Sequence, residues 1–171
     1  MKKLRIFASL FLVSVIINSC GILDKDYKLV SHGGINIEAP LTWKITKDKE
    51  DGAYTLELEP LAADNIVIVT AFEGFRDWEE LMEIYQSSLR NSMPQSQQKI
   101  RFSDLERKVF HEMESYECEF DGAYTMLIYK GRIIVFDDDS RTYSFLITGS
   151  KRFIESEQLK HILDSFKIES K

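Results

Sequence analysis

The 171-residue sequence has few of the residue types from which catalytic and metal sites are usually built. Its three histidines (His32, His111 and His161) stand far apart, and none has a second ligand at helical or strand spacing. A Gly-x-Ser-x-Gly motif is absent, and His111-Glu112 lacks the later histidine that a zinc-protease helix needs. The sequence therefore predicts a protein that is not an enzyme and that has neither a cofactor nor a bound metal.

Basic residues are also in the minority, because 22 Lys and Arg are set against 28 Asp and Glu, for a formal net charge of −6. An acidic domain is not attracted to a phosphate backbone, so no nucleic-acid partner is expected. The acidic run Asp137-Asp138-Asp139 could supply calcium ligands, but it lacks the spaced ligands and the distal glutamate of an EF-hand. We interpret it as a solvated hairpin turn between two strands.

Apolar runs long enough to cross a membrane are absent as well. The apolar run at residues 6–17 is shorter than the ~20 residues that span the hydrocarbon core. Three basic residues precede this run among the first five positions, and Ser19-Cys20 follows it as a small residue before a cysteine. This order of basic region, apolar region and cleavage site is that of a secretory signal.

With Cys20 as the first residue after cleavage, the segment resembles a bacterial lipoprotein signal. The resemblance implies that residues 1–19 are removed, that Cys20 carries fatty chains such as palmitate, and that residues 20–28 tether a single domain over residues 29–171. The protein would then bind a membrane of the cell envelope through its lipid anchor, and we expect the outer membrane rather than the inner. A transmembrane helix and an ordinary signal peptide that leaves Cys20 unmodified are the alternatives.

Cys118 is then the only thiol left in the mature chain, so no internal disulfide is expected. In the stretch Tyr116-Glu117-Cys118-Glu119-Phe120 the apolar residues alternate with glutamates, which places Cys118 on the inward face of a strand. We expect a buried structural thiol rather than a reactive one.

Alternating apolar and polar residues, bounded by turn residues, predict the strands. The expected strands are residues 35–38, 43–46, 53–59 and 66–69, followed by a four-stranded meander of residues 107–120, 124–130, 132–137 and 142–148. Turns in the meander are expected at Asp121-Gly122, Lys130-Gly131 and Asp138-Asp139-Ser140.

Two amphipathic helices complete the pattern. The first begins after Asp77, a good N-cap with Glu80 three residues later as in a capping box, and Pro94 ends it. The second covers about residues 152–165. Because strands and helices do not alternate, the order predicts an α+β fold with a mostly antiparallel sheet and a helix packed on each face.

Two short motifs make the chain resemble a PsbP-like domain. Residues 35–43, Ile-Asn-Ile-Glu-Ala-Pro-Leu-Thr-Trp, are similar to the opening strand and Pro-x-x-Trp corner of that family, and residues 162–167 are similar to its closing Ser-Phe helix terminus. The resemblance implies a PsbP-like α/β/α sandwich with Trp43 in its core. Its members share protein binding or scaffolding rather than a reaction, and the lipoprotein signal points to DcrB-like envelope lipoproteins.

An aromatic loop is the candidate contact surface for such a partner, an unidentified envelope protein. Phe72, Phe75 and Trp78 flank Gly74 at the start of the first helix. The function expected from the sequence is therefore that of a membrane-anchored, non-catalytic protein-binding or scaffolding domain.

Three tyrosines on neighbouring meander strands, Tyr124, Tyr129 and Tyr143, indicate an alternative function. Tyrosine combines apolar area with a hydroxyl group, so these residues could line a cleft for a small apolar or lipid-like ligand between sheet and helix. The same residues could instead seal the rim of the core, which the pattern favours.

Overall fold

The computed structural model describes residues 26–61, 64–91, 100–124 and 127–169. The signal segment 1–19, Cys20 and Pro94 lie outside the described residues. In chain order the elements are β1 (Tyr27–His32), β2 (Ile35–Pro40), β3 (Lys44–Glu50), β4 (Ala53–Glu59), β5 (Ile66–Phe72), α1 (Trp78–Asn91), β6 (Ile100–Phe102), β7 (Glu106–Phe110), β8 (Met113–Tyr124), β9 (Leu127–Asp137), β10 (Thr142–Gly149), α2 (Lys151–Ile154), α3 (Glu157–Asp164) and β11 (Lys167–Ile168).

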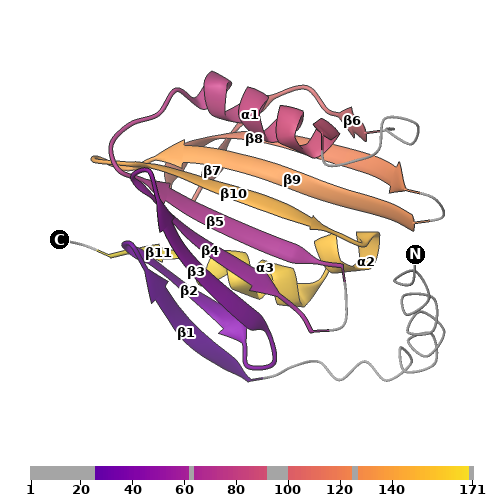
Figure 1. Ribbon diagram of the computed structural model, residues 1–171, viewed down its shortest axis with the longest axis horizontal. Coiled ribbons are helices and arrows are strands. Elements are labelled where there is room, and N and C mark those ends of the chain that lie inside the picture. Colours follow the sequence, from indigo (N-terminus) through magenta and orange to yellow (C-terminus); the bar gives the residue numbers. More distant parts are fainter. Residues whose placement is uncertain (1–25, 62–63, 92–99, 125–126, 170–171) are drawn as a thin grey trace, which may run out of the picture.

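An eight-stranded antiparallel sheet forms the middle layer of the domain (Figure 1). Its order is β3-β4-β5-β10-β9-β8, with β6 and β7 both paired to β8 at the far edge. Helix α1 covers one face, here called the upper face, while α2, α3 and a small sheet of order β1-β2-β11 cover the lower face (Figure 1). The predicted α+β architecture, a mostly antiparallel sheet with helices on both faces, is confirmed.

Strand β9 shows how the sequence fills both layers. Ile133 and Val135 point into the upper core beneath α1, whereas Ile134 and Phe136 point into the lower core with Trp43. Neighbouring residues of a strand face opposite sides, so the continuous apolar run at residues 133–136 supports two cores at once. The buried position predicted for Trp43 is confirmed.

The turns expected at Gly122 and Gly131 are wrong, because β8 and β9 run straight through both glycines. Gly122 lies opposite Tyr129, and Gly131 lies opposite Phe120. In each pair the aromatic ring occupies the space that a Cβ atom on the glycine would fill. These glycines therefore serve close packing inside strands rather than a change of chain direction.

The strand predicted at residues 107–120 is in fact a hairpin, β7–β8. It reverses at His111 and Glu112, whose φ angles of 48° and 67° are left-handed. A two-residue turn with both φ angles positive matches the twist of the flanking strands. The turn at residues 138–140 is confirmed, since the Asp138 carboxylate accepts hydrogen bonds from the backbone N–H groups of Ser140 and Arg141.

The two ends of the domain also differ from expectation. The last helix is two helices, because Ser156 interrupts it and caps α3 by accepting a hydrogen bond from the Leu159 N–H at 3.1 Å. Strand β1 begins at Tyr27, inside the predicted tether. Only Val30 of its six residues is buried, so its sequence does not show the alternation that predicts a strand. No helix in the described part of the chain is long and apolar enough to span a bilayer.

Candidate functional site

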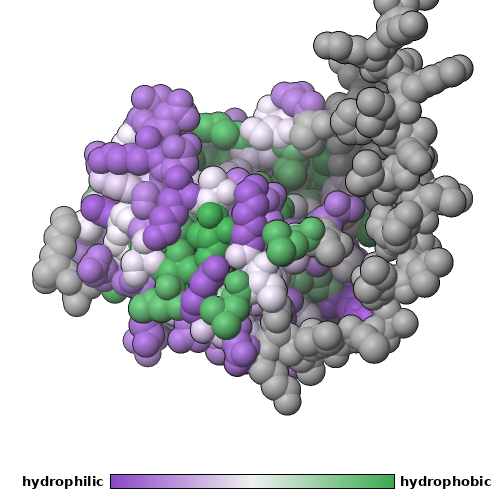
Figure 2. Space-filling view, turned by 60° about the horizontal axis from the view of Figure 1, so that its bottom comes forward, coloured by the Kyte–Doolittle hydropathy of each residue, from purple (hydrophilic) through white to green (hydrophobic). Residues whose placement is uncertain are grey.

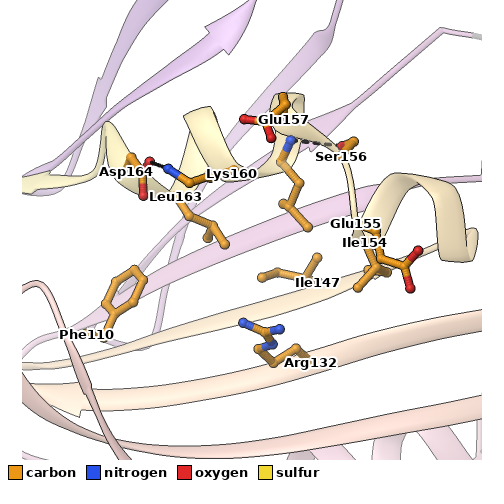
Figure 3. A pocket seen from close by; sticks show the side chains of 11 residues that line it. Phe110, Arg132, Ile147, Ile154, Glu155, Ser156, Glu157, Lys160, Leu163 and Asp164 are labelled. Carbon is orange, nitrogen blue, oxygen red and sulfur yellow. Dashed lines mark hydrogen bonds and ion pairs between the residues drawn. The ribbon is translucent and has the colours of Figure 1, made fainter.

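A groove of about 330 Å³ opens on the lower face between the α2–α3 segment and the sheet (Figure 3). We call it the α3 groove. Its apolar lining comes from β7, β10 and both helices, namely Phe110, Ile147, Ile154, Leu159 and Leu163. Its charged lining consists of Arg132 on β9 and, around the helices, Glu155, Glu157, Lys160 and Asp164.

Serine caps shape the wall of the groove. Ser150 accepts a hydrogen bond from the Phe153 N–H and starts α2, and Ser156 starts α3 six residues later. Because the helix is interrupted between them, Glu155 stands at the groove beside Ile154 (Figure 3). The groove therefore combines an apolar floor with a charged rim, an arrangement suited to a molecule with both apolar and polar parts.

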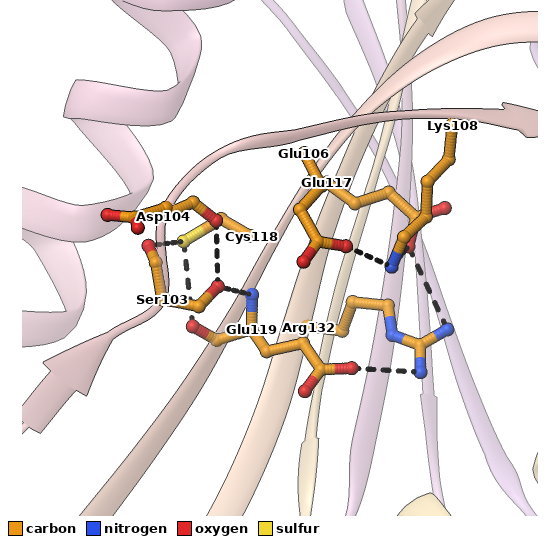
Figure 4. Close-up of polar contacts among 8 residues, drawn as sticks. All are labelled: Ser103, Asp104, Glu106, Lys108, Glu117, Cys118, Glu119 and Arg132. Carbon is orange, nitrogen blue, oxygen red and sulfur yellow. Dashed lines mark hydrogen bonds and ion pairs between the residues drawn. The ribbon is translucent and has the colours of Figure 1, made fainter.

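Arg132 joins the groove to a charged network on the lower face of β7, β8 and β9 (Figure 4). Its guanidinium lies 3.4 Å from a Glu119 carboxylate oxygen and 4.0 Å from one of Glu117. Lys108 lies 3.5 Å from Glu117 and 2.9 Å from Glu106. Among the described residues, the buried Oε2 of Glu117 has no hydrogen-bond partner.

Opposite charges compensate one another in this network. A hydrogen bond to Glu106 holds the pKa of Lys108 above its ordinary value, and the same bond lowers the pKa of Glu106. Both groups thus stay charged near neutral pH. Paired charges of this kind can bind and orient a polar group.

The aromatic loop at the start of α1 lies at one end of the upper face. Asp77 begins the helix by accepting hydrogen bonds from the N–H groups of Glu79 and Glu80, which confirms the predicted cap. Phe72 and Trp78 are half-buried against the upper core, whereas Phe75 is 63% exposed. The structure thus places two of the three predicted contact residues against one core cluster and the third in solvent.

Two residues that the sequence analysis missed extend this surface. The Tyr116 ring stacks on Trp78 with centroids 4.0 Å apart and an interplanar angle of 3°. Val109, on the same face of the adjacent strand β7, is 74% exposed. We call Phe75, Trp78, Tyr116 and Val109 the aromatic surface. Tyr116 could have been found from its alternation with Cys118. Val109 could not, because the sequence predicted one continuous strand where β7 and β8 form a hairpin.

The predicted tyrosine cleft is not formed by Tyr129 and Tyr143, which lie on opposite faces of the sheet. Tyr143 pairs with Phe136 in the lower core, while Tyr129 packs across Gly122 in the upper layer. A one-residue difference in strand parity sends a side chain to the other face. The side chain of Tyr124 lies outside the described residues.

Tyr143 is a core residue with one polar contact. Its hydroxyl donates a hydrogen bond to Asp138 at 3.0 Å. Burial, followed by this bond to a carboxylate, raises the pKa of Tyr143 to about 12. The interpretation of this tyrosine as a sealing residue of the core is confirmed.

Cys118 is 1% exposed and lies on the upper face of β8. Its Sγ atom is 3.5 Å from the Ser103 carbonyl oxygen (Figure 4) and 3.7 Å from the Gln86 side-chain nitrogen. Burial raises the pKa of the thiol, so it stays protonated near neutral pH. The predicted buried structural thiol is confirmed.

The three histidines occupy separate places, as their wide spacing predicted. Each contacts a different group: His32 faces the Asp48 carbonyl, His111 the Leu163 carbonyl and His161 the Glu38 carboxylate. Within the part of the chain that the structure describes, no three His, Cys, Asp or Glu side chains are grouped so as to hold a metal ion.

No family model matches the sequence, and no curated protein does either. The fold, in contrast, is similar to solved structures. Cyanobacterial PsbP (CyanoP) from Synechocystis sp. PCC 6803 gives a TM-score of 0.62 at 14% identity, over 89% of this chain and 98% of that protein.

Two further structures extend the comparison. LpqN of Mycobacterium tuberculosis, described as involved in cell envelope biogenesis, gives 0.51 at 10% identity over 85% of this chain and 91% of its own. The Ran-binding protein Mog1p of Saccharomyces cerevisiae gives 0.50 at 11% identity over 84% and 95%. At these identities the similarity shows the fold alone, and the predicted PsbP-like sandwich is confirmed.

Proposed function

We propose that this protein is a lipid-anchored protein of the bacterial cell envelope whose domain binds another envelope protein and catalyses no reaction. Lipid on Cys20 holds the domain at a membrane, for which the outer membrane is the expected location. The PsbP-like fold supports this proposal, because one protein with a similar fold, LpqN, is described as involved in cell envelope biogenesis.

The observation that carries the protein-binding function is the aromatic surface. Trp and Tyr are enriched among the residues that dominate binding energy, because each offers a broad ring with a polar group. The rings of Trp78 and Tyr116 are stacked at 4.0 Å, and Phe75 stands exposed three residues before Trp78. Rings that are already held in place lose little conformational freedom when a partner binds.

Affinity purification of the lipidated protein from its own membranes tests this function, with Cys20→Ala as the control for anchoring. Phe75→Ala removes the exposed ring, and Ile128→Ala removes an apolar side chain that is 71% exposed on β9. We expect a stoichiometric partner that Ile128→Ala retains and Phe75→Ala loses. A protein recovered alone contradicts the function, and a partner that both variants retain equally contradicts the choice of surface.

The α3 groove favours a second candidate function, the binding of a small apolar or lipid-like ligand between sheet and helix. Its volume of about 330 Å³ lies at the low end of the range of ligand sites, and its floor is apolar. Calorimetric titration with a short-chain fatty acid should release heat that Leu163→Glu abolishes and Ile128→Glu preserves. If the unsubstituted protein shows no heat of binding at two well-separated temperatures, the groove is not such a site, because apolar burial has an enthalpy that changes with temperature.

A further inference from the structure

The short segment between Cys20 and the first strand limits how the domain can lie relative to a membrane. Only six residues, 21–26, separate Cys20 from Tyr27. At full extension they reach about 20 Å. The main sheet has six strand spacings from β3 to β7, which amount to about 29 Å. The side of the domain that carries β1 must therefore be nearest to a bilayer that holds the anchor.

Exposed apolar side chains lie at this side of the domain. Leu29 is 67% exposed, because Val30 beside it points into the lower core and turns Leu29 outward. Leu41 is 51% exposed and lies next to the start of the described chain, since its N–H donates a hydrogen bond to the Asp26 carbonyl at 3.0 Å. Figure 2 shows apolar side chains gathered among hydrophilic ones on the face that carries the small sheet.

Two lysines lie close to the backbone of this side. The Lys28 ammonium lies 3.4 Å from the Leu41 carbonyl oxygen, and the Lys47 ammonium lies 2.8 Å from the Ser31 carbonyl oxygen of β1. Neither forms an ion pair with a carboxylate in the described part of the chain, although the protein as a whole is acidic. By strand alternation Lys28 lies on the face of β1 that carries the buried Val30, opposite Leu29, so only its contact with Leu41 places it at this side of the domain.

We propose that the β1 side of the domain rests on the bilayer, with Leu29 and Leu41 in the interfacial region. This inference rests on the proposed lipid anchoring at Cys20. The bilayer is the surface that this side meets, because the anchor brings it within reach. Val109 of the aromatic surface is on β7, at the opposite edge of the main sheet, and faces away from the membrane.

Nitroxide labelling of the lipidated protein in phosphatidylethanolamine–phosphatidylglycerol vesicles tests the orientation. Labels are attached at Leu29→Cys, Leu41→Cys and, as a matched control, Val109→Cys, each in a Cys118→Ser background. All three labelled positions are exposed, so the cores keep their packing, which circular dichroism checks. Flotation measures anchoring, and power saturation measures collision of each label with oxygen and with a water-soluble nickel chelate.

The expected result is that labels at Leu29 and Leu41 collide more with oxygen and less with the nickel chelate than the label at Val109. Floating protein with all three labels open to the nickel chelate overturns the orientation and leaves the anchoring intact. Labels at Leu29 and Leu41 shielded from both reagents overturn it too, since a second copy or another protein then covers them. Protein that does not float refutes the anchoring and the orientation together.

Discussion

The substitution Gly131→Ala tests whether this glycine lies inside a strand, packed against an aromatic ring of the paired strand. In Gly131→Ala the new Cβ overlaps the Phe120 ring and the backbone carbonyl oxygen of Ile147. Phe120 is buried in the upper core and the carbonyl belongs to β10, so neither neighbour can move alone. The matched variant is Gly122→Ala, whose Cβ has its nearest contacts with the far end of the half-buried Tyr129 ring, at 2.6 Å.

The expected cost follows from these contacts. Overpacking a core costs about 1–3 kcal/mol, and the fixed neighbours of Gly131 place Gly131→Ala near the upper end. Replacing glycine lowers the entropy of the unfolded chain, which returns about 0.4–1 kcal/mol. We therefore expect Gly131→Ala to lower the free energy of unfolding by about 2 kcal/mol and Gly122→Ala by about 0–1 kcal/mol.

Urea titration followed by tryptophan fluorescence measures both free energies, and an unchanged slope of the transition shows that each variant unfolds from the same compact state. If Gly131 were in an exposed turn, alanine would cost little there. Equal stability of the two variants, or a larger loss for Gly122→Ala, would refute the packing of glycine against aromatic rings.

Three other changes probe the capped turn, the helix break and the thiol. Asp138→Asn should lower the free energy of unfolding by about 1 kcal/mol at neutral pH, since it weakens hydrogen bonds to a charged group. Burial raises the pKa of Asp138, but the hydrogen bonds lower it on balance. The contribution is therefore lost as pH falls through the folded-state pKa, and acid titrations of the two proteins should converge. Ser156→Ala should cost about 1 kcal/mol in thermal unfolding by removing the α3 cap, and a stable variant would contradict that role. Cys118 should react with a thiol reagent only after unfolding in urea; rapid reaction of the folded protein would contradict its burial.

The aromatic surface differs from the rest of the upper face in how its rings are supported. Trp78 starts a capped helix and Tyr116 lies on a central part of β8, so two independent elements hold the stack. One fold can host unrelated functions, so function depends on the surface that each chain builds on the fold. Under the proposed function, a partner meets rings that these two elements already hold in place.

Local patterns in the sequence determined the element types and the layer architecture. The alternation in β4, the cap at Asp77 and the apolar stripe that follows it are short-range features, and the structure bears them out. The buried state of Cys118 followed from the same alternation, whereas that of Trp43 was implied by the resemblance to PsbP-like domains. These features depend on neighbours within a few residues, which a single sequence displays directly.

Only the tertiary structure decided which residues meet. The sequence predicted turns at Gly122 and Gly131. Glycine is needed there because an aromatic ring on the paired strand fills the space of a Cβ atom, and the sequence does not show that pairing. In the same way, strand register separated Tyr129 from Tyr143 and brought Tyr116 under Trp78. Register depends on which strands pair and in what alignment, and that choice is made by contacts between segments far apart in the chain.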